Sequence, residues 1–97
     1  MKKDTTDFNS DFLYKAVLAL ETMDECKAFF SDLCTIPELK SITQRLVVAK
    51  MLSDNYVYSQ IVKETGASTA TISRVNRSLT FGCNGYEKIF ERIKEEE

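Results

Sequence analysis

The chain lacks the residues that most catalytic and metal sites depend on. Its 97 residues include no histidine, and its three cysteines, Cys26, Cys34 and Cys83, form no CxxC pair. Acid–base catalysis near neutral pH most often uses histidine, and structural zinc sites need histidine or closely spaced cysteines. We therefore expect no catalytic residue, no metal site, no cofactor and no enzymatic activity. The cysteines fit free thiols in a reducing cytoplasm, with Cys26 and Cys34 as small packing residues and Cys83 as a loop thiol.

Long apolar runs are also missing, and so is a strong positive charge. No stretch is long enough to cross a bilayer, and no hydrophobic segment follows the MKKD start, so the sequence predicts neither a membrane span nor a signal peptide. The length fits one domain, residues 1–97. The net charge of −2 argues against a strong nucleic-acid binder.

The charges are unevenly distributed along the chain. Acidic residues gather near both ends, whereas residues 58–85 contain only Lys63, Glu64, Arg74 and Arg77 as charged groups. This segment is the least acidic part of the chain, yet it is only weakly basic. If it binds a polyanion, it makes few phosphate contacts and has a low affinity per subunit.

Helix-forming residues dominate, and there are only one proline and three glycines. Apolar residues recur at helical spacing in six segments. We expect helices at about residues 10–23, 24–33 and 37–52, two more within 58–79, and a last one at about 86–94. The sequence therefore predicts an all-α chain.

The most informative segment is residues 58–79, YSQIVKETGASTATISRVNRSL. Gly66 stands where two short helices would turn sharply, and Ser68 fits the N-cap of the second helix. Ile61 and Val62 are expected to face inward, and a second inward stripe carries Ile72 and Val75. This pattern is typical of a helix-turn-helix.

The opposite face of the second helix carries small and basic side chains. Short residues near its N-terminus would let it enter a major groove, and arginines one turn apart could reach phosphates or guanine edges. The partner that this face fits is double-stranded DNA. The alternative is that the two helices only build a core and the arginines complement a helix dipole. The face comprises Thr69, Ala70, Ser73 and Arg77, flanked by Thr71 and Arg74.

The N-terminal third carries more apolar surface than a short helical monomer can cover. Each large side chain left exposed forgoes about 1.5–3 kcal/mol. We therefore expect residues 1–34 to be dimerisation helices that interlock with a second copy, the alternative being a tightly wrapped monomer. The apolar residues concerned are Phe8, Phe12, Leu13, Leu20, Phe29, Phe30 and Leu33.

The strings LCTIPELKSITQRLVVAKML and GASTATISRVNRSL resemble the Trp repressor superfamily, and ETGASTATISRVNRSL with FGCNGY resembles its YerC/YecD-like group. The resemblance covers about residues 30–97. It implies a six-helix chain in an intertwined homodimer, with the fourth and fifth helices as the DNA reader. It places Thr69, Ala70 and Thr71 near base edges and Ser73 near a phosphate, while Ser59 and Val62 replace basic residues. The predicted DNA-binding set is Ser59, Ser68, Thr69, Ala70, Thr71, Ser73, Arg74 and Arg77.

The resemblance also implies an effector site, on weaker grounds. Arg45 and Arg74 match the arginines that sandwich an indole in the Trp repressor, and Thr35 and Ser78 match positions beside that ligand. Val75 replaces a glycine that lies against the ligand, so we expect no useful affinity for tryptophan. The simpler interpretation of Arg45 is a surface residue paired with an acid such as Glu38.

The sequence thus predicts a cytoplasmic, homodimeric, sequence-specific DNA-binding transcriptional regulator, of repressor type and without tryptophan response. The alternative is a helical protein-interaction adaptor with no direct DNA binding. A docking face of that kind should carry a large apolar or aromatic anchor, and the face around Thr69 has none.

Overall fold

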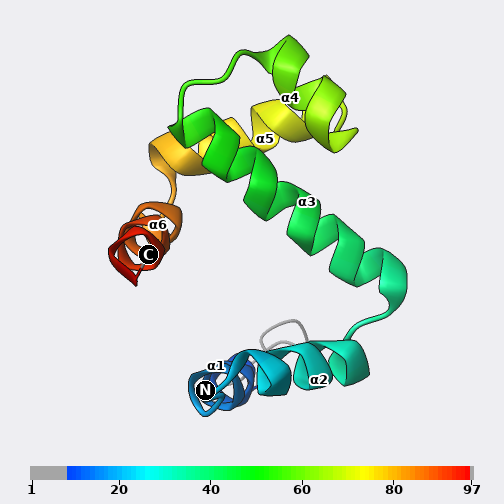
Figure 1. Ribbon diagram of the computed structural model, residues 1–97, viewed down its shortest axis with the longest axis vertical. Helices are drawn as coiled ribbons and strands as arrows, with labels where there is room; N and C mark the ends of the chain where they lie inside the picture. Colours follow the sequence, from blue (N-terminus) through cyan, green and yellow to red (C-terminus); the bar gives the residue numbers. More distant parts are fainter. Residues whose placement is uncertain (1–8, 97) are drawn as a thin grey trace, which may run out of the picture. The chain divides into compact units, whose positions relative to one another are not determined.

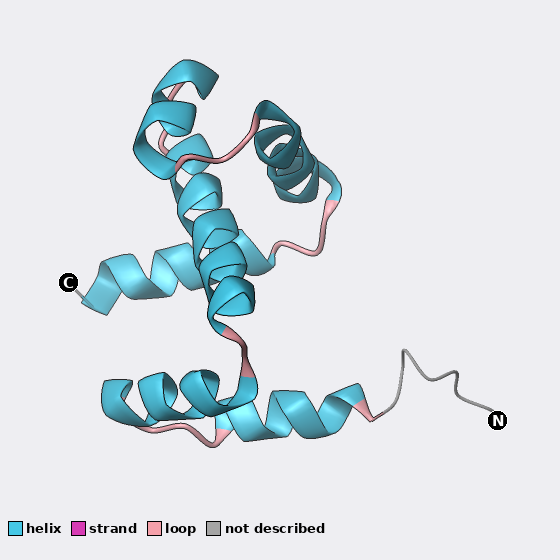
Figure 2. Cartoon of the chain, turned by 90° about the vertical axis from the view of Figure 1, so that its right-hand side faces the viewer, coloured by secondary structure: helices cyan, strands magenta, loops and turns pink. Residues whose placement is uncertain are grey.

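The computed structural model describes residues 9–96, and every regular element in this range is an α-helix (Figure 1; Figure 2). The all-α, six-helix prediction is confirmed for these residues. Phe8, one of the apolar residues assigned to dimerisation, lies outside the described range. The helices are α1 (Ser10–Leu18), α2 (Met23–Leu33), α3 (Ile36–Ser53), α4 (Tyr58–Thr65), α5 (Thr69–Phe81) and α6 (Gly85–Glu96).

The first helix is shorter than its apolar spacing predicts. It ends at Leu18 instead of continuing to residue 23. The next helix begins after Thr22, whose hydroxyl accepts a hydrogen bond from the Glu25 N–H at 3.1 Å. In return, the Glu25 carboxylate accepts from the Glu21 N–H at 2.8 Å. This capping arrangement satisfies two free N–H groups and so starts a new helix at this point.

The chain divides into two compact units, residues 1–39 and 40–97, with the boundary in the first turns of α3. Among the described residues of the first unit, none is fully buried. Phe29 and Phe30 pack edge to face there, with ring centroids 5.3 Å apart. Phe12 is 69% exposed and Leu18 is 84% exposed. The first unit therefore has no enclosed core of its own.

The second unit has a small, dry core. Val48 and Ala49 of α3 are fully buried, together with Ile61 of α4 and Ile72 and Val75 of α5. The buried residues at this centre are all apolar, and Tyr86 and Phe90 of α6 stack beside it with ring centroids 5.9 Å apart. This core holds the inward faces of α4 and α5, and the outward faces of these two helices remain exposed to solvent.

The cysteines are free thiols, as expected, but they are less enclosed than the sequence indicates. Cys26 and Cys34 are half-buried and Cys83 is exposed. In the unit that holds Cys26 and Cys34, none of the described side chains is fully enclosed, which explains the difference. Among the described helices, none is long and apolar enough to cross a membrane.

The turn at Gly66 generates the first prediction. Gly66 has φ of 73°, in the left-handed region, although a Cβ there would meet no atom within 4 Å. Gly85 also has open space for a Cβ but an ordinary φ. We expect Gly66→Ala to lower the free energy of unfolding by about 1–2 kcal/mol, because an L-residue is strained at positive φ. Gly85→Ala should leave it unchanged or raise it by up to about 1 kcal/mol.

Urea unfolding followed by circular dichroism measures both variants against the unmodified chain. Equal effects of the two substitutions would contradict a special role for the Gly66 backbone.

Candidate nucleic-acid interface

The turn between α4 and α5 is fixed by a short chain of hydrogen bonds. The Thr65 hydroxyl donates to the Ile61 carbonyl at 2.7 Å and accepts from the Ala67 N–H at 3.1 Å. The Gln44 side chain, which comes from α3, donates to the Thr65 carbonyl at 3.1 Å. Gly66 ends α4 in the left-handed conformation, and Ala67 is buried directly after it. The angle between α4 and α5 is therefore tied to the core.

The N-terminus of α5 is capped by Ser68, as its position after the glycine predicts. The Ser68 hydroxyl oxygen accepts from the Thr71 N–H at 3.1 Å. The same hydroxyl donates to the Thr71 hydroxyl oxygen, also at 3.1 Å. Thr69 and Ala70, between these two residues, are exposed. The helix therefore presents a narrow, hydroxyl-bearing end to solvent.

The residues predicted to contact DNA lie on the free side of this unit. Thr71 is half-buried, while on the other side of α5 Ile72 and Val75 are enclosed in the core, as predicted. The two faces of α5 are thus separated, and between Thr69 and Arg77 the outer one carries only small, polar and basic side chains. The exposed members of the predicted DNA-binding set are Ser59 of α4, the cap residue Ser68, and Thr69, Ala70, Ser73, Arg74 and Arg77 of α5.

Val62 was expected to face inward, and this prediction is wrong. Ile61 is fully buried, but Val62 is 37% exposed. A helix of eight residues has one narrow inward stripe, and Tyr58, Ile61 and Thr65 occupy it at i, i+3 and i+7. Val62 is one step, about 100°, around the helix from Ile61. It therefore adds an apolar side chain to the outer surface.

The positive charges of this surface are not neutralised within the described chain. The ion pair that the described residues form joins Lys50 to Asp54 at 3.1 Å, in α3 and the loop after it. Among the described residues, neither Arg74 nor Arg77 forms an ion pair with an acidic side chain. No aspartate or glutamate belongs to the predicted DNA-binding set. The two guanidinium groups therefore remain available to an anionic partner.

Two of the four residues assigned to an effector site meet at one cavity. Arg45 of α3 and Arg74 of α5 line a cavity of about 160 Å³ together with Ala70 and Thr71. Three of its lining residues, Ala70, Thr71 and Arg74, thus also belong to the predicted DNA-binding set. An occupant of this cavity would touch the start of α5.

The expected pairing of Arg45 with Glu38 is not formed. The Arg45 guanidinium donates to the Ser41 hydroxyl at 3.3 Å, one turn back along α3. The Glu38 carboxylate instead accepts from the Thr35 N–H at 2.8 Å, and the Thr35 hydroxyl accepts from the Glu38 N–H at 3.2 Å. The bond from the Thr35 backbone N–H, and after it the Thr35 side chain, hold the pKa of the Glu38 carboxyl below its usual value. The carboxylate caps α3, and among the described residues Arg45 forms no ion pair.

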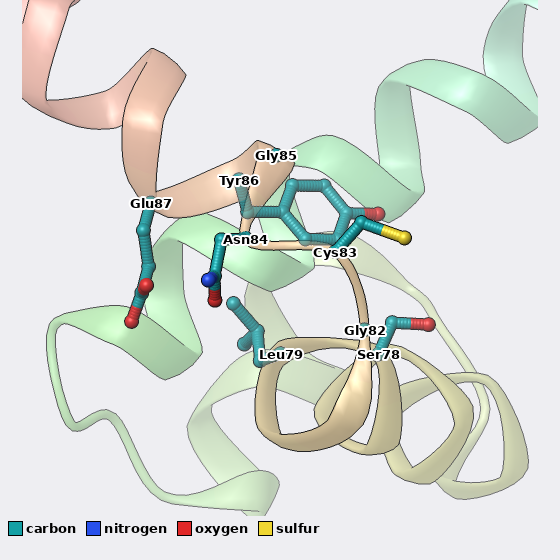
Figure 3. A pocket seen from close by; sticks show the side chains of 8 residues that line it. All are labelled: Ser78, Leu79, Gly82, Cys83, Asn84, Gly85, Tyr86 and Glu87. Atoms are coloured by element: carbon teal, nitrogen blue, oxygen red, sulfur yellow. The ribbon is translucent and has the colours of Figure 1, made fainter.

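The other two effector candidates lie elsewhere. Thr35 belongs to the first unit, where it forms this cap. Ser78 lines a cavity of about 370 Å³ between the end of α5 and the start of α6, with Cys83 and Tyr86 among its other walls (Figure 3). Val75, which replaces the glycine of the Trp repressor, is 2% exposed. The described part of the chain thus gathers the two arginines but does not bring Ser78 to their cavity.

The sequence did not indicate three of the contacts that shape this surface. These are the Gln44 bond to the turn, the double role of the Thr65 hydroxyl, and the bond between the Ser68 and Thr71 hydroxyls. Spacing within Ser68–Thr71 is a helix-start signal and could have suggested the last of them. A contact between residues 21 positions apart, such as that of Gln44, leaves no local signal.

The helices and their turn define a class of protein, an all-helical chain with a helix-turn-helix. Residues 9–94 match the model of a protein family described as Trp repressor protein. An uncharacterized protein, YerC, from Bacillus subtilis (strain 168) is 52% identical over 87 residues, which are 90% of this chain and 84% of that protein.

Two solved structures resemble the chain closely. One is a candidate Trp repressor from Staphylococcus aureus, with a TM-score of 0.84, 52% identity, and coverage of 87% of this chain and 84% of that one. The other is a TrpR-like protein from Eubacterium eligens ATCC 27750, also with a TM-score of 0.84 and 52% identity, covering 87% of each chain. The chain belongs to the Trp repressor family, whose members are regulators and not enzymes. The resemblance inferred from the sequence is confirmed.

Proposed function

We propose that this protein is a sequence-specific DNA-binding transcriptional regulator of repressor type that acts as a homodimer in the cytoplasm. The observation that carries the proposal is the outer face of α5. Small hydroxyl side chains and two unpaired arginines stand on it, directly over a buried apolar core. Such a face fits a major groove, and membership of the Trp repressor family supports the same function.

The side chains on this face suit a moderate degree of base selection. Thr69, Ala70 and Thr71 lack the bidentate reach of arginine or asparagine, so they would select bases through thymine methyl groups, single hydrogen bonds and water. Ser59 and Ser73 would bind phosphates. Arg74 and Arg77 would supply the positive charge, and the small number of cations implies strong dependence on a second subunit.

Two features support the dimer. The first unit, which includes the whole of the proposed dimerisation segment 1–34, encloses none of its described side chains. In the second unit, an apolar groove of about 430 Å³ lies between α3 and α6, with Val47 and Ile93 about half-exposed along it. A monomer would leave both surfaces in water, at about 1.5–3 kcal/mol for each large side chain. A two-fold dimer would also place two α5 helices for successive major grooves.

We infer that tryptophan is not the effector. The cavity between Arg45 and Arg74 measures about 160 Å³, and Val75, the residue after Arg74, has its side chain packed in the core. Of the four predicted effector contacts, Arg45 and Arg74 remain the proposed contacts of any other small effector. We infer that DNA binding does not require tryptophan.

The alternative function is an adaptor that binds a larger regulatory protein. The low positive charge of residues 58–85 favours it. Protein-docking faces, however, are usually centred on a large aromatic or apolar anchor. The outer face of α5 between Thr69 and Arg77 carries no such side chain.

DNA binding predicts a specific response to salt. We expect fluorescence anisotropy with genomic duplex fragments to show an affinity that falls steeply as salt rises. Arg77→Ala should weaken binding to all sequences and reduce the slope of log K against log salt by about 0.9 per lost phosphate contact. Arg92→Ala, which removes an exposed arginine of α6, is the matched control and should change the slope little. Absence of binding even at low salt would favour the adaptor.

The dimer predicts a mass of about twice the 11.1 kDa of one chain in sedimentation equilibrium. Phe12→Asp should dissociate it by more than about 100-fold, since a two-fold interface loses the buried side chain twice. Phe81→Asp changes a phenylalanine that is also exposed, 82% against 69%, but lies at the end of α5. It should leave the mass unchanged. A wild-type mass of one chain would contradict the dimer.

If the protein does not bind tryptophan, mixing the two should release no heat of binding. Titration calorimetry with tryptophan should give no saturable signal below about 1 mM, and DNA affinity should be the same with and without it. A micromolar dissociation constant would show that the cavity opens further than its walls suggest.

A further inference from the structure

Ser68 does more at the start of α5 than cap it. A cap needs only an oxygen that accepts a backbone N–H, and Ser68 provides this to the Thr71 N–H. Its own proton is committed as well, because the hydroxyl donates to the Thr71 hydroxyl oxygen at 3.1 Å. An N-cap that is also bonded to a side chain at N3 couples the cap to the DNA-facing surface.

Both ends of this hydroxyl pair are held in place. Ala67, just before Ser68, is 2% exposed, and the Ser68 carbonyl accepts from the Ile72 N–H at 3.0 Å. Ile72, just after Thr71, is fully buried. The backbone on either side of the pair is therefore anchored in the core. The backbone anchors therefore keep the two hydroxyl groups within reach of one another.

The bond changes what Thr71 can offer to a base. A hydroxyl has one proton and two lone pairs, and a hydroxyl that turns freely can either donate or accept. The Thr71 oxygen accepts the Ser68 proton with one of its two lone pairs, so the directions of its own O–H and of its remaining lone pair are restricted. Thr69, two residues earlier, has no such partner among the described residues, and its hydroxyl can turn freely.

We propose that Ser68 is a positioning residue for base selection, acting through Thr71. It holds the Thr71 hydroxyl in one orientation toward the major groove. Base pairs differ in where they present hydrogen-bond donors and acceptors there, so a hydroxyl held in one orientation fits some of them better than others. The inference rests on the proposed function, because it assumes that α5 enters a major groove.

The test is selection of bound duplexes from a random pool by the full-length protein and four variants. Thr71→Val removes the reading hydroxyl in nearly the same shape. Ser68→Gly removes the positioning hydroxyl and leaves α5 nearly as well capped, since glycine at an N-cap costs only a few tenths of a kcal/mol. Ser68→Thr keeps both bonds. The double variant Ser68→Gly/Thr71→Val closes a double-mutant cycle.

We expect the wild-type protein and Ser68→Thr to favour the same base pair over the others at one position of each half-site. Thr71→Val should reduce that discrimination by about three- to tenfold, the worth of one neutral hydrogen bond. Ser68→Gly should reduce it at the same position, and the double variant should lose no more than Thr71→Val alone. Circular dichroism melting of each variant shows whether α5 stays folded.

Each other outcome overturns the inference. If the wild-type protein enriches a sequence and Ser68→Gly selects the same one as strongly, Ser68 is only a cap. Additive losses in the double variant would mean that Ser68 contacts DNA independently of Thr71. If the wild-type protein enriches no sequence at all, the proposed function fails and this inference fails with it.

Discussion

The turn that joins α4 to α5 is the constraint on which the outer surface depends. The left-handed Gly66, the two bonds of the Thr65 hydroxyl and the bond from Gln44 hold the chain between two buried residues, Ile61 and Ala67. Because these contacts run into the core, the first turn of α5 has one fixed direction. Small side chains suffice on its outer face only because their backbone is placed so firmly.

The two units of the chain differ in how much apolar surface they enclose. The second unit contains the enclosed core and carries the helix-turn-helix. The first unit has helices with apolar faces but encloses none of its described side chains. A single chain also offers few positive charges to DNA. A second copy would remedy both shortages, since it would cover apolar surface and double the number of phosphate contacts.

Much of this architecture follows from the sequence, because local rules decide it. Helical spacing and the position of Gly66 gave the helix-turn-helix, and the stripe of Ile72 and Val75 is indeed buried. Apolar spacing alone does not predict the early end of α1, because apolar residues continue at helical spacing past Leu18, although Thr22 and Glu25 carry a capping signature. Apolar spacing also places Val62 inside, but a helix of eight residues buries only a narrow stripe of side chains, and Val62 lies outside that stripe.

Contacts between distant segments account for the remaining differences. The bond from Gln44 to the Thr65 carbonyl joins α3 to a turn 21 residues further along the chain, and no local pattern marks it. The most direct test of the account is an NMR titration of the ¹⁵N-labelled protein with a selected duplex. We expect the largest amide shifts at residues 68–71 and along the outer face of α5. Shifts confined to α6 or to the first unit would contradict it.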